Sequence, residues 1–146
     1  MNSEIASSQV APKNLAAFIL AGNATFTVRS QKTGTRFTYK VRQPKADAPH
    51  FVSLLSGSDN ENDFSFLGTI FNASSFVFGR KSRVSPDAPS ARAAQWVVSR
   101  VLKGQELTNC EIWHEGRCGK CNRKLTVPES IDSGIGPECA KRLGMA

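Results

Sequence analysis

Several features that mark other classes of protein are missing from this chain of 146 residues. No apolar run approaches the roughly 18 residues that a membrane-spanning helix needs, because the longest, residues 15–21, is far too short. The first eight residues include Glu4 and no basic cluster, so we do not expect a secretory signal. These absences predict a soluble, cytoplasmic protein with no membrane partner.

Residues and motifs suited to enzymatic catalysis are also scarce. The chain has two histidines, His50 and His114, and it shows no Ser–His–Asp arrangement, phosphate-binding loop, HExxH motif or paired-carboxylate spacing. Acidic residues alternate between Asp59 and Asp63 as in a cation-binding loop, but the glycine and terminal glutamate of an EF-hand are absent. We therefore expect an acidic turn there and a non-enzymatic protein.

The charge of the chain is strongly biased. Nineteen Lys and Arg against twelve Asp and Glu give a net charge of +7, and the pI is near 9.6. This balance favours an anionic partner, most commonly nucleic acid, although it is also compatible with a role in solubility alone. The basic candidates for phosphate contact form three groups: Arg29, Arg36, Lys40 and Arg42; Arg80, Lys81 and Arg83; and Arg117, Lys120, Arg123 and Lys124.

Alternating apolar and polar residues predict an antiparallel β-sheet. Residues 24–30 and 36–42 alternate with period two, and Gly34 lies in the hairpin loop between them. Apolar Phe37 and Tyr39 are expected to face the core, opposite the basic side chains; only on an uncovered face would they stack on bases. With further strands at 51–55, 64–71 and 75–78, the pattern predicts a meander of four or five strands.

Helical patterns flank these strands. Pro12 can open a short helix that Gly22 closes. Ser90 is the expected N-cap of a second helix that Gly104 ends, and its apolar stripe at i, i+3, i+4 and i+7 from Ala94 is suited to covering the sheet. The fold class is therefore α+β. The expected organisation is a flexible leader (1–13), an antiparallel sheet with one amphipathic helix (14–104) and a zinc-binding module (105–146).

The four cysteines all lie after residue 109, which is typical of a metal site and not of a disulfide framework. Cys118 and Cys121 form a Cys-x2-Cys pair on a tight turn, and Gly119 allows backbone amides to approach the sulfurs. Cys139 begins a predicted short helix, where the helix dipole favours a thiolate. We expect these three residues to hold one structural Zn²⁺ ion; a redox pair with an unrelated third thiol is the alternative.

A closed zinc site needs a fourth ligand, and two residues are candidates. His114 gives the spacing His-x3-Cys-x2-Cys-x17-Cys, whereas Cys110 lies further from the pair and would give an all-cysteine site. We prefer His114, and a water molecule or another ligand is the third option. The alternative interpretations are an ordinary surface histidine, or one stacked beside Trp113, for His114 and a small buried hydrophobic residue for Cys110.

The C-terminal residues resemble an uncharacterised zinc-domain family that is common in phage and plasmid accessory genes. The resemblance is carried by the runs WHEGRCGKC (113–121) and GIGPEC (134–139), and more loosely by TRFTYK (35–40). It is close over 110–143, although Asn122 stands where such sequences often have glycine. The resemblance implies a small treble-clef or zinc-ribbon-like module and a mobile-element setting, but no activity.

Two functions follow from these features. The first is a phage or plasmid accessory protein that binds nucleic acid, DNA in preference to RNA, through the basic surfaces of the sheet and the cysteine turn. The alternative is a protein-interaction module that inhibits a host defence or replication protein, using the acidic turn at 59–63, the sheet face or the edge strand at 75–78.

Overall fold

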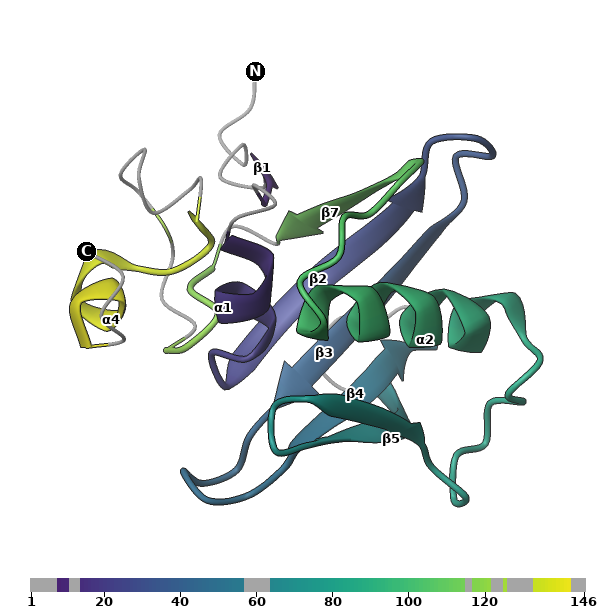
Figure 1. The fold of residues 1–146 in the computed structure, drawn as a ribbon, viewed down its shortest axis with the longest axis horizontal. Coiled ribbons are helices and arrows are strands. Elements are labelled where there is room, and N and C mark those ends of the chain that lie inside the picture. Colours follow the sequence, from purple (N-terminus) through teal and green to yellow (C-terminus); the bar gives the residue numbers. More distant parts are fainter. Residues whose placement is uncertain are drawn as a thin grey trace.

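A seven-stranded antiparallel sheet forms the centre of the molecule, in the strand order β1-β7-β2-β3-β4-β5-β6 (Figure 1). The computed structural model describes residues 8–10, 14–56, 64–114, 117–121, 125 and 133–142. The strands are β1 (Ser8–Gln9), β2 (Asn23–Ser30), β3 (Arg36–Arg42), β4 (His50–Leu55), β5 (Phe64–Phe71), β6 (Ser75–Phe78) and β7 (Cys110–His114). The helices are α1 (Leu15–Ile19), α2 (Pro89–Leu102) and α4 (Pro137–Arg142).

The predicted meander is confirmed, since β2 to β6 pair consecutively in an antiparallel manner. Gly34 adopts a positive φ of 74° in the hairpin loop between β2 and β3, as expected. The sheet is larger than predicted because β7 pairs with β2 and β1 pairs with β7. These two strands come from residues that the sequence assigned to the zinc module and the leader, so the sheet extends beyond the expected limits of 14–104.

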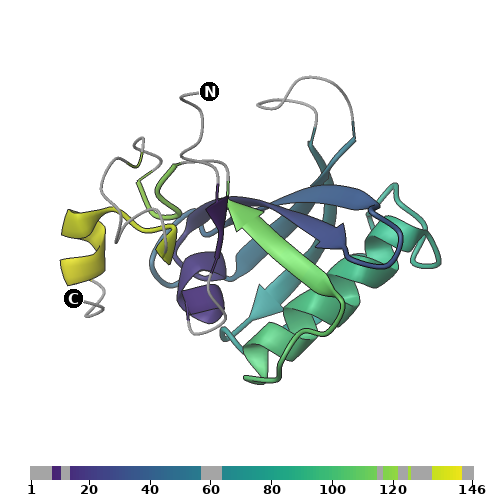
Figure 2. The same ribbon diagram turned by 90° about the horizontal axis from the view of Figure 1, so that it is seen from above.

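Helix α2 crosses one face of the sheet and closes the main core (Figures 1 and 2). Its predicted stripe, from Ala94 to Val101, is buried, and the Tyr39 hydroxyl of β3 donates a 2.6 Å hydrogen bond to the Ser90 carbonyl. The prediction of Ser90 as N-cap is wrong, because Ala88 caps a helix that begins with Pro89. Proline suits the first helical position, where its missing N–H has no partner in any case.

Helix α1 is shorter than the expected 12–21 and covers the same face near the start of β2. It buries Leu15, Phe18 and Ile19, and the Phe18 ring meets Phe26 of β2 edge to face at 6.3 Å between centroids. Gly22 follows with a φ of 125°, which suits the turn into β2. None of the helices in the described residues is long and apolar enough to cross a membrane.

Candidate metal centre and basic sheet face

Cys118, Cys121 and Cys139 come together as the sequence predicts. Their sulfur atoms all lie within 4.8 Å of one another. The first two stand on the turn after β7 and the third lies in the first turn of α4, with Cys118 and Cys139 buried and Cys121 exposed. Three thiols this close can share one metal ion, so the cluster is compatible with a zinc module.

The surroundings of Cys118 and Cys139 shift the pKa values of these two thiols in opposite directions. Burial opposes the ionisation of Cys118, but backbone N–H groups directed at its sulfur, including that of Lys120 at 3.3 Å, lower its pKa overall. Burial, together with the neighbouring cysteines, raises the pKa of Cys139 to about 12. A lowered pKa for Cys118 beside a raised pKa for Cys139 is the pattern expected of neighbouring thiols, because like charges at this distance repel.

The cysteine turn is attached to the sheet by backbone hydrogen bonds and by one aromatic ring. The Asn23 N–H donates to the Gly119 carbonyl at 2.7 Å, and the Gly119 N–H donates to the Gly134 carbonyl at 2.8 Å. A Cβ atom at Gly119 or Gly134 would lie 2.9 or 2.5 Å from the ring of Phe18, so both glycines are required for this close approach. Phe18 is therefore the side chain on which the turn packs.

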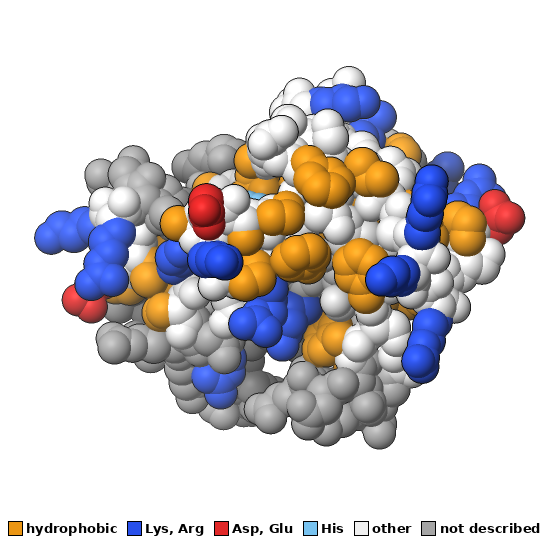
Figure 3. All heavy atoms as spheres, turned by 90° about the horizontal axis from the view of Figure 1, so that it is seen from below, with side chains coloured by type: hydrophobic (Ala, Val, Ile, Leu, Met, Phe, Trp, Pro, Cys, Tyr) orange, Lys and Arg blue, Asp and Glu red, His pale blue; other side chains and the backbone are white. Residues whose placement is uncertain are grey.

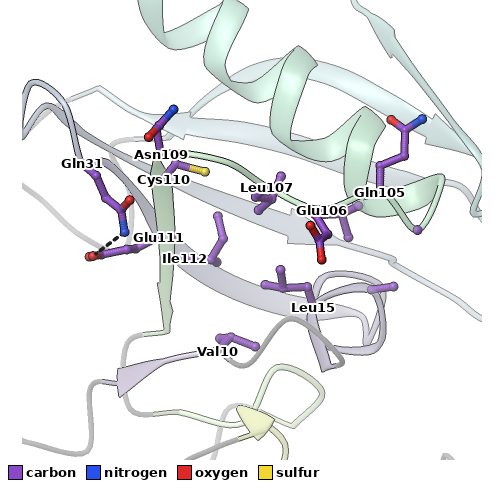
Figure 4. Close-up of a pocket in the computed structure, with 13 residues that line it drawn as sticks. Val10, Leu15, Gln31, Gln105, Glu106, Leu107, Asn109, Cys110, Glu111 and Ile112 are labelled. Atoms are coloured by element: carbon purple, nitrogen blue, oxygen red, sulfur yellow. Dashed lines mark hydrogen bonds between the residues drawn. The ribbon is translucent and has the colours of Figure 1, made fainter.

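The two candidates for the fourth ligand lie at opposite ends of β7, and neither belongs to the group of three cysteines. His114, at the end nearer the cysteine turn, is fully buried, and its ring centroid lies 6.2 Å from that of Phe18. Cys110, at the other end, pairs with Ser30 and lines a cavity of about 580 Å³ bounded by β7, α1 and the connection after α2 (Figure 4). Of the two, His114 lies beside Phe18, the side chain on which the cysteine turn packs.

The first basic group lies on the outer face of the sheet, opposite α2, as predicted. Strand register places Lys40 across from Thr25 and Ser53, and Arg42 across from Phe51. Inward-facing residues of the same strands, such as Val41, are buried. In the described part of the chain no helix packs on this outer face (Figure 2). Within the described residues this face therefore has no covering layer of helices.

Arg29 differs from the other basic residues of this face because it is already paired. Its guanidinium forms a 3.2 Å salt bridge with Glu111 of β7. Hydrogen bonds from Trp113 and Gln31, followed by that of Arg29, hold the pKa of Glu111 below its usual value. Glu111 therefore stays ionised and balances the charge of Arg29, which leaves Arg36, Lys40 and Arg42 as the cations available on this face.

Aromatic residues accompany the cations, but Phe37 and Tyr39 are not among them. Tyr39 is buried beneath α2, and Phe37 faces the same way, so neither can stack on a base from the outer side. Phe51 is 37% exposed instead, and the Lys40 ammonium lies 4.9 Å from the centroid of the Phe64 ring. Phe66 and Trp113 lie on the same outer face, since each pairs across strands with an outward residue.

The other two basic groups occupy different parts of the molecule. Arg80, Lys81 and Arg83 are exposed on the connection from the edge strand β6 to α2. Arg117 and Lys120 are exposed on the cysteine turn, and a Cβ at Gly22 would lie 3.5 Å from Lys120 Nζ. Since Asn23 pairs with Arg42, Lys120 lies at the same end of the sheet as Arg42. Arg123, Lys124 and the acidic turn at 59–63 lie outside the described residues.

Among known proteins, the C-terminal part of the chain is similar to a domain whose role is not established. Residues 113–144 match the model of a family of unknown function, DUF6011. No curated protein and no solved structure matches the chain. The matched residues contain all three cysteines of the cluster and begin within β7, so this domain includes the possible metal site.

Proposed function

We propose that this chain is a non-enzymatic, zinc-binding accessory protein of a phage or plasmid, and that it binds nucleic acid in the host cytoplasm. The observation that carries the proposal is the open outer face of the sheet. Arg36, Lys40 and Arg42 project from it between the hydroxyl groups of Thr25 and Thr38. Arg, Lys and Thr side chains are the usual contacts of phosphate oxygens. Together with the net charge of +7, this face supports nucleic acid as the ligand, and we propose DNA ahead of RNA.

The proposed role of the metal is structural. Zinc is supported by the chemistry of the donors, because three thiolates on a turn and a helix start are ligands that Zn²⁺ prefers. His114 is the proposed fourth ligand, since it is buried beside the ring that contacts Gly119 and Gly134. A zinc ion at this position would fix the turn on which Lys120 approaches the sheet.

The salt dependence of binding tests the proposal. Fluorescence anisotropy of the zinc-loaded protein with labelled single-stranded DNA, duplex DNA and RNA gives the affinity at several salt concentrations. Each lost phosphate contact lowers the slope of log K against log salt by about 0.7–0.9. We therefore expect the double variant Arg36→Ala, Arg42→Ala to bind more weakly and to lose about 1.5 units of slope.

The matched control is the double variant Arg92→Ala, Lys103→Ala, which also removes two positive charges, from exposed positions on α2 and at its C-cap, away from the outer face. We expect it to change neither affinity nor slope by a comparable amount. Unchanged binding in the double variant would exclude the sheet face as the site. Equal weakening of binding by the control double variant would show that only the overall charge matters.

One observation favours the alternative of a protein partner. The edge strand β6 exposes half of Val77 and borders the exposed Phe71, and an uncovered edge strand can pair with an extended segment of another protein. Inhibition of a host defence or replication protein would use such a surface. Capture of the same host protein by the wild type but not by Val77→Lys, after nuclease treatment, would support this alternative.

A further inference from the structure

The outer face of the sheet holds an exposed apolar patch as well as cations. Among the described residues the large exposed hydrophobic side chains are Phe51, Phe71, Val77 and Trp96, and the first three lie close together. Phe51 and Val77 flank Thr69 across the strands, and Phe71 follows Thr69 by two residues on the same side of β5. Seen from the side of β5, hydrophobic side chains gather in the middle of the surface with Lys and Arg around them (Figure 3).

A cation lies directly beside this patch. Arg42 of β3 is paired with Phe51 of β4, and directly opposed residues have Cβ atoms about 5 Å apart. Arg42 is exposed and can extend along the edge of the Phe51 ring. A planar group stacked on Phe51 would therefore have an attached phosphate within reach of the Arg42 guanidinium.

We infer that the ligand of this face is a single-stranded nucleic acid, with one base stacked on Phe51 and its backbone phosphate on Arg42. This inference rests on the proposed function and narrows it. An aromatic ring with neighbouring cations is the combination that single-strand binders use, because every base has a flat π-face that can stack.

A duplex fits this surface less well. In a duplex the flat faces of the bases are stacked on each other, and only phosphates and groove edges are exposed. A major groove admits a helix or a two-stranded ribbon, whereas the outer face is the broad side of a seven-stranded sheet. In a complex with a duplex, the patch formed by Phe51, Phe71 and Val77 would face charged phosphates. The phosphates would lose hydration there, and no stacking contact would offset that cost.

Phe64 has a different role on the same face. The Lys40 ammonium lies 4.9 Å above its ring, so that side of Phe64 is already covered by a cation. Among the described residues no cation lies over the Phe51 ring, and Phe51 is the more exposed of the two. Stacking is therefore assigned to Phe51, and Lys40 is left to contact the phosphate backbone.

Anisotropy with a short single strand and with a hairpin duplex of the same sequence tests the inference. We expect tighter binding of the single strand. Phe51→Ala should weaken single-strand binding by about 5- to 150-fold, the range measured for one stacked base, with the salt slope unchanged. Phe51→Trp should restore most of the affinity, because it keeps an aromatic face. Trp96→Ala is the matched control, since it removes a similarly exposed aromatic side chain from α2.

The outcomes of this experiment distinguish failure of the single-strand inference from failure of the proposed function. Equal affinity for single strand and duplex, or binding that Phe51→Ala leaves unchanged, would overturn the single-strand inference and leave nucleic-acid binding intact. Absence of binding to every nucleic acid would reject the proposed function itself. If Phe51→Ala instead altered only the oligomeric state measured by light scattering, the patch would be a contact between copies of this chain and the inference would be wrong.

Discussion

Gly134→Ala is the substitution that best tests how the cysteine turn is joined to the sheet. Gly134 has a φ of 77°, in the left-handed region that residues with a Cβ adopt at a cost. An added Cβ would also lie 2.5 Å from Cδ1 of Phe18, closer than real Cβ contacts come. Phe18 cannot easily give way, because it is fully buried and packs against Phe26 and His114.

Both effects can be given a magnitude. A left-handed backbone conformation costs about 1–2 kcal/mol for a residue with a Cβ. Forcing an extra methyl group into a well-packed contact costs about 1–3 kcal/mol more. We therefore expect Gly134→Ala to lower the free energy of unfolding by about 2–5 kcal/mol, which is a large part of the stability of a domain of this size.

Gly104→Ala is the matched control for the backbone cost. Gly104 has a φ of 70°, yet a Cβ there would meet no atom within 4 Å. Its substitution should cost only the conformational part, about 1–2 kcal/mol. Urea unfolding of the metal-loaded proteins, followed by circular dichroism, gives both free energies from the same assay.

The difference between the two variants isolates the contact with Phe18. Equal losses for Gly134→Ala and Gly104→Ala would refute the packing argument, because only the φ cost would then be present. A second substitution, Phe18→Leu, removes the ring that meets the new methyl group. If the argument holds, the loss caused by Gly134→Ala should be smaller in the Phe18→Leu background than in the wild type.

The remaining predictions concern the metal and the core. Metal analysis should find one zinc ion per chain, and Cys121→Ser should lose it together with part of the stability, because a structural zinc ion contributes folding energy directly. Visible absorption of the cobalt-substituted protein should change in His114→Ala but not in Cys110→Ala, and the reverse result would make Cys110 the fourth ligand. Tyr39→Phe should lower the free energy of unfolding in urea by about 1–2 kcal/mol, since it removes the buried hydrogen bond to the Ser90 carbonyl; a loss below measurement error would contradict the burial of that bond.

The features that the sequence predicted well are local ones. Period-two alternation fixes both the position of a strand and its solvent-facing side, so the outward direction of Arg36, Lys40 and Arg42 followed from the pattern of 36–42 alone. The Cys-x2-Cys spacing is equally local, because two residues between thiols place both sulfurs on one turn. The position of Cys139 beside this pair could be predicted only because a closed zinc site needs further ligands.

The features that the sequence did not reveal depend on distant pairing. Strand β7 has five residues, and nothing in its own pattern selects β2, some eighty residues earlier, as its neighbour. The direction in which the aromatic side chains of β4 and β5 point could not be predicted from the sequence either. The apolar residues of 64–71 are interrupted by Ser65, Gly68 and Thr69 without a period of two, and the strand pairing shifts register after Val52. Periodicity therefore could not tell which rings face outward.

Strand β7 connects the two proposed roles of the molecule. Its outward residues, Glu111 and Trp113, lie on the same face as the cations of β3, while His114 points inward beside Phe18. The cysteine turn follows this strand. It is joined to the sheet by the Asn23–Gly119 hydrogen bond and by the Phe18 ring, and its buried Cys118 belongs to the same apolar core. If zinc fixes the turn, it therefore also stabilises the end of β7 that carries Trp113. Metal loss should then disturb the proposed binding face first at Trp113. Phe51 should be affected later, because it lies on β4, three strands away.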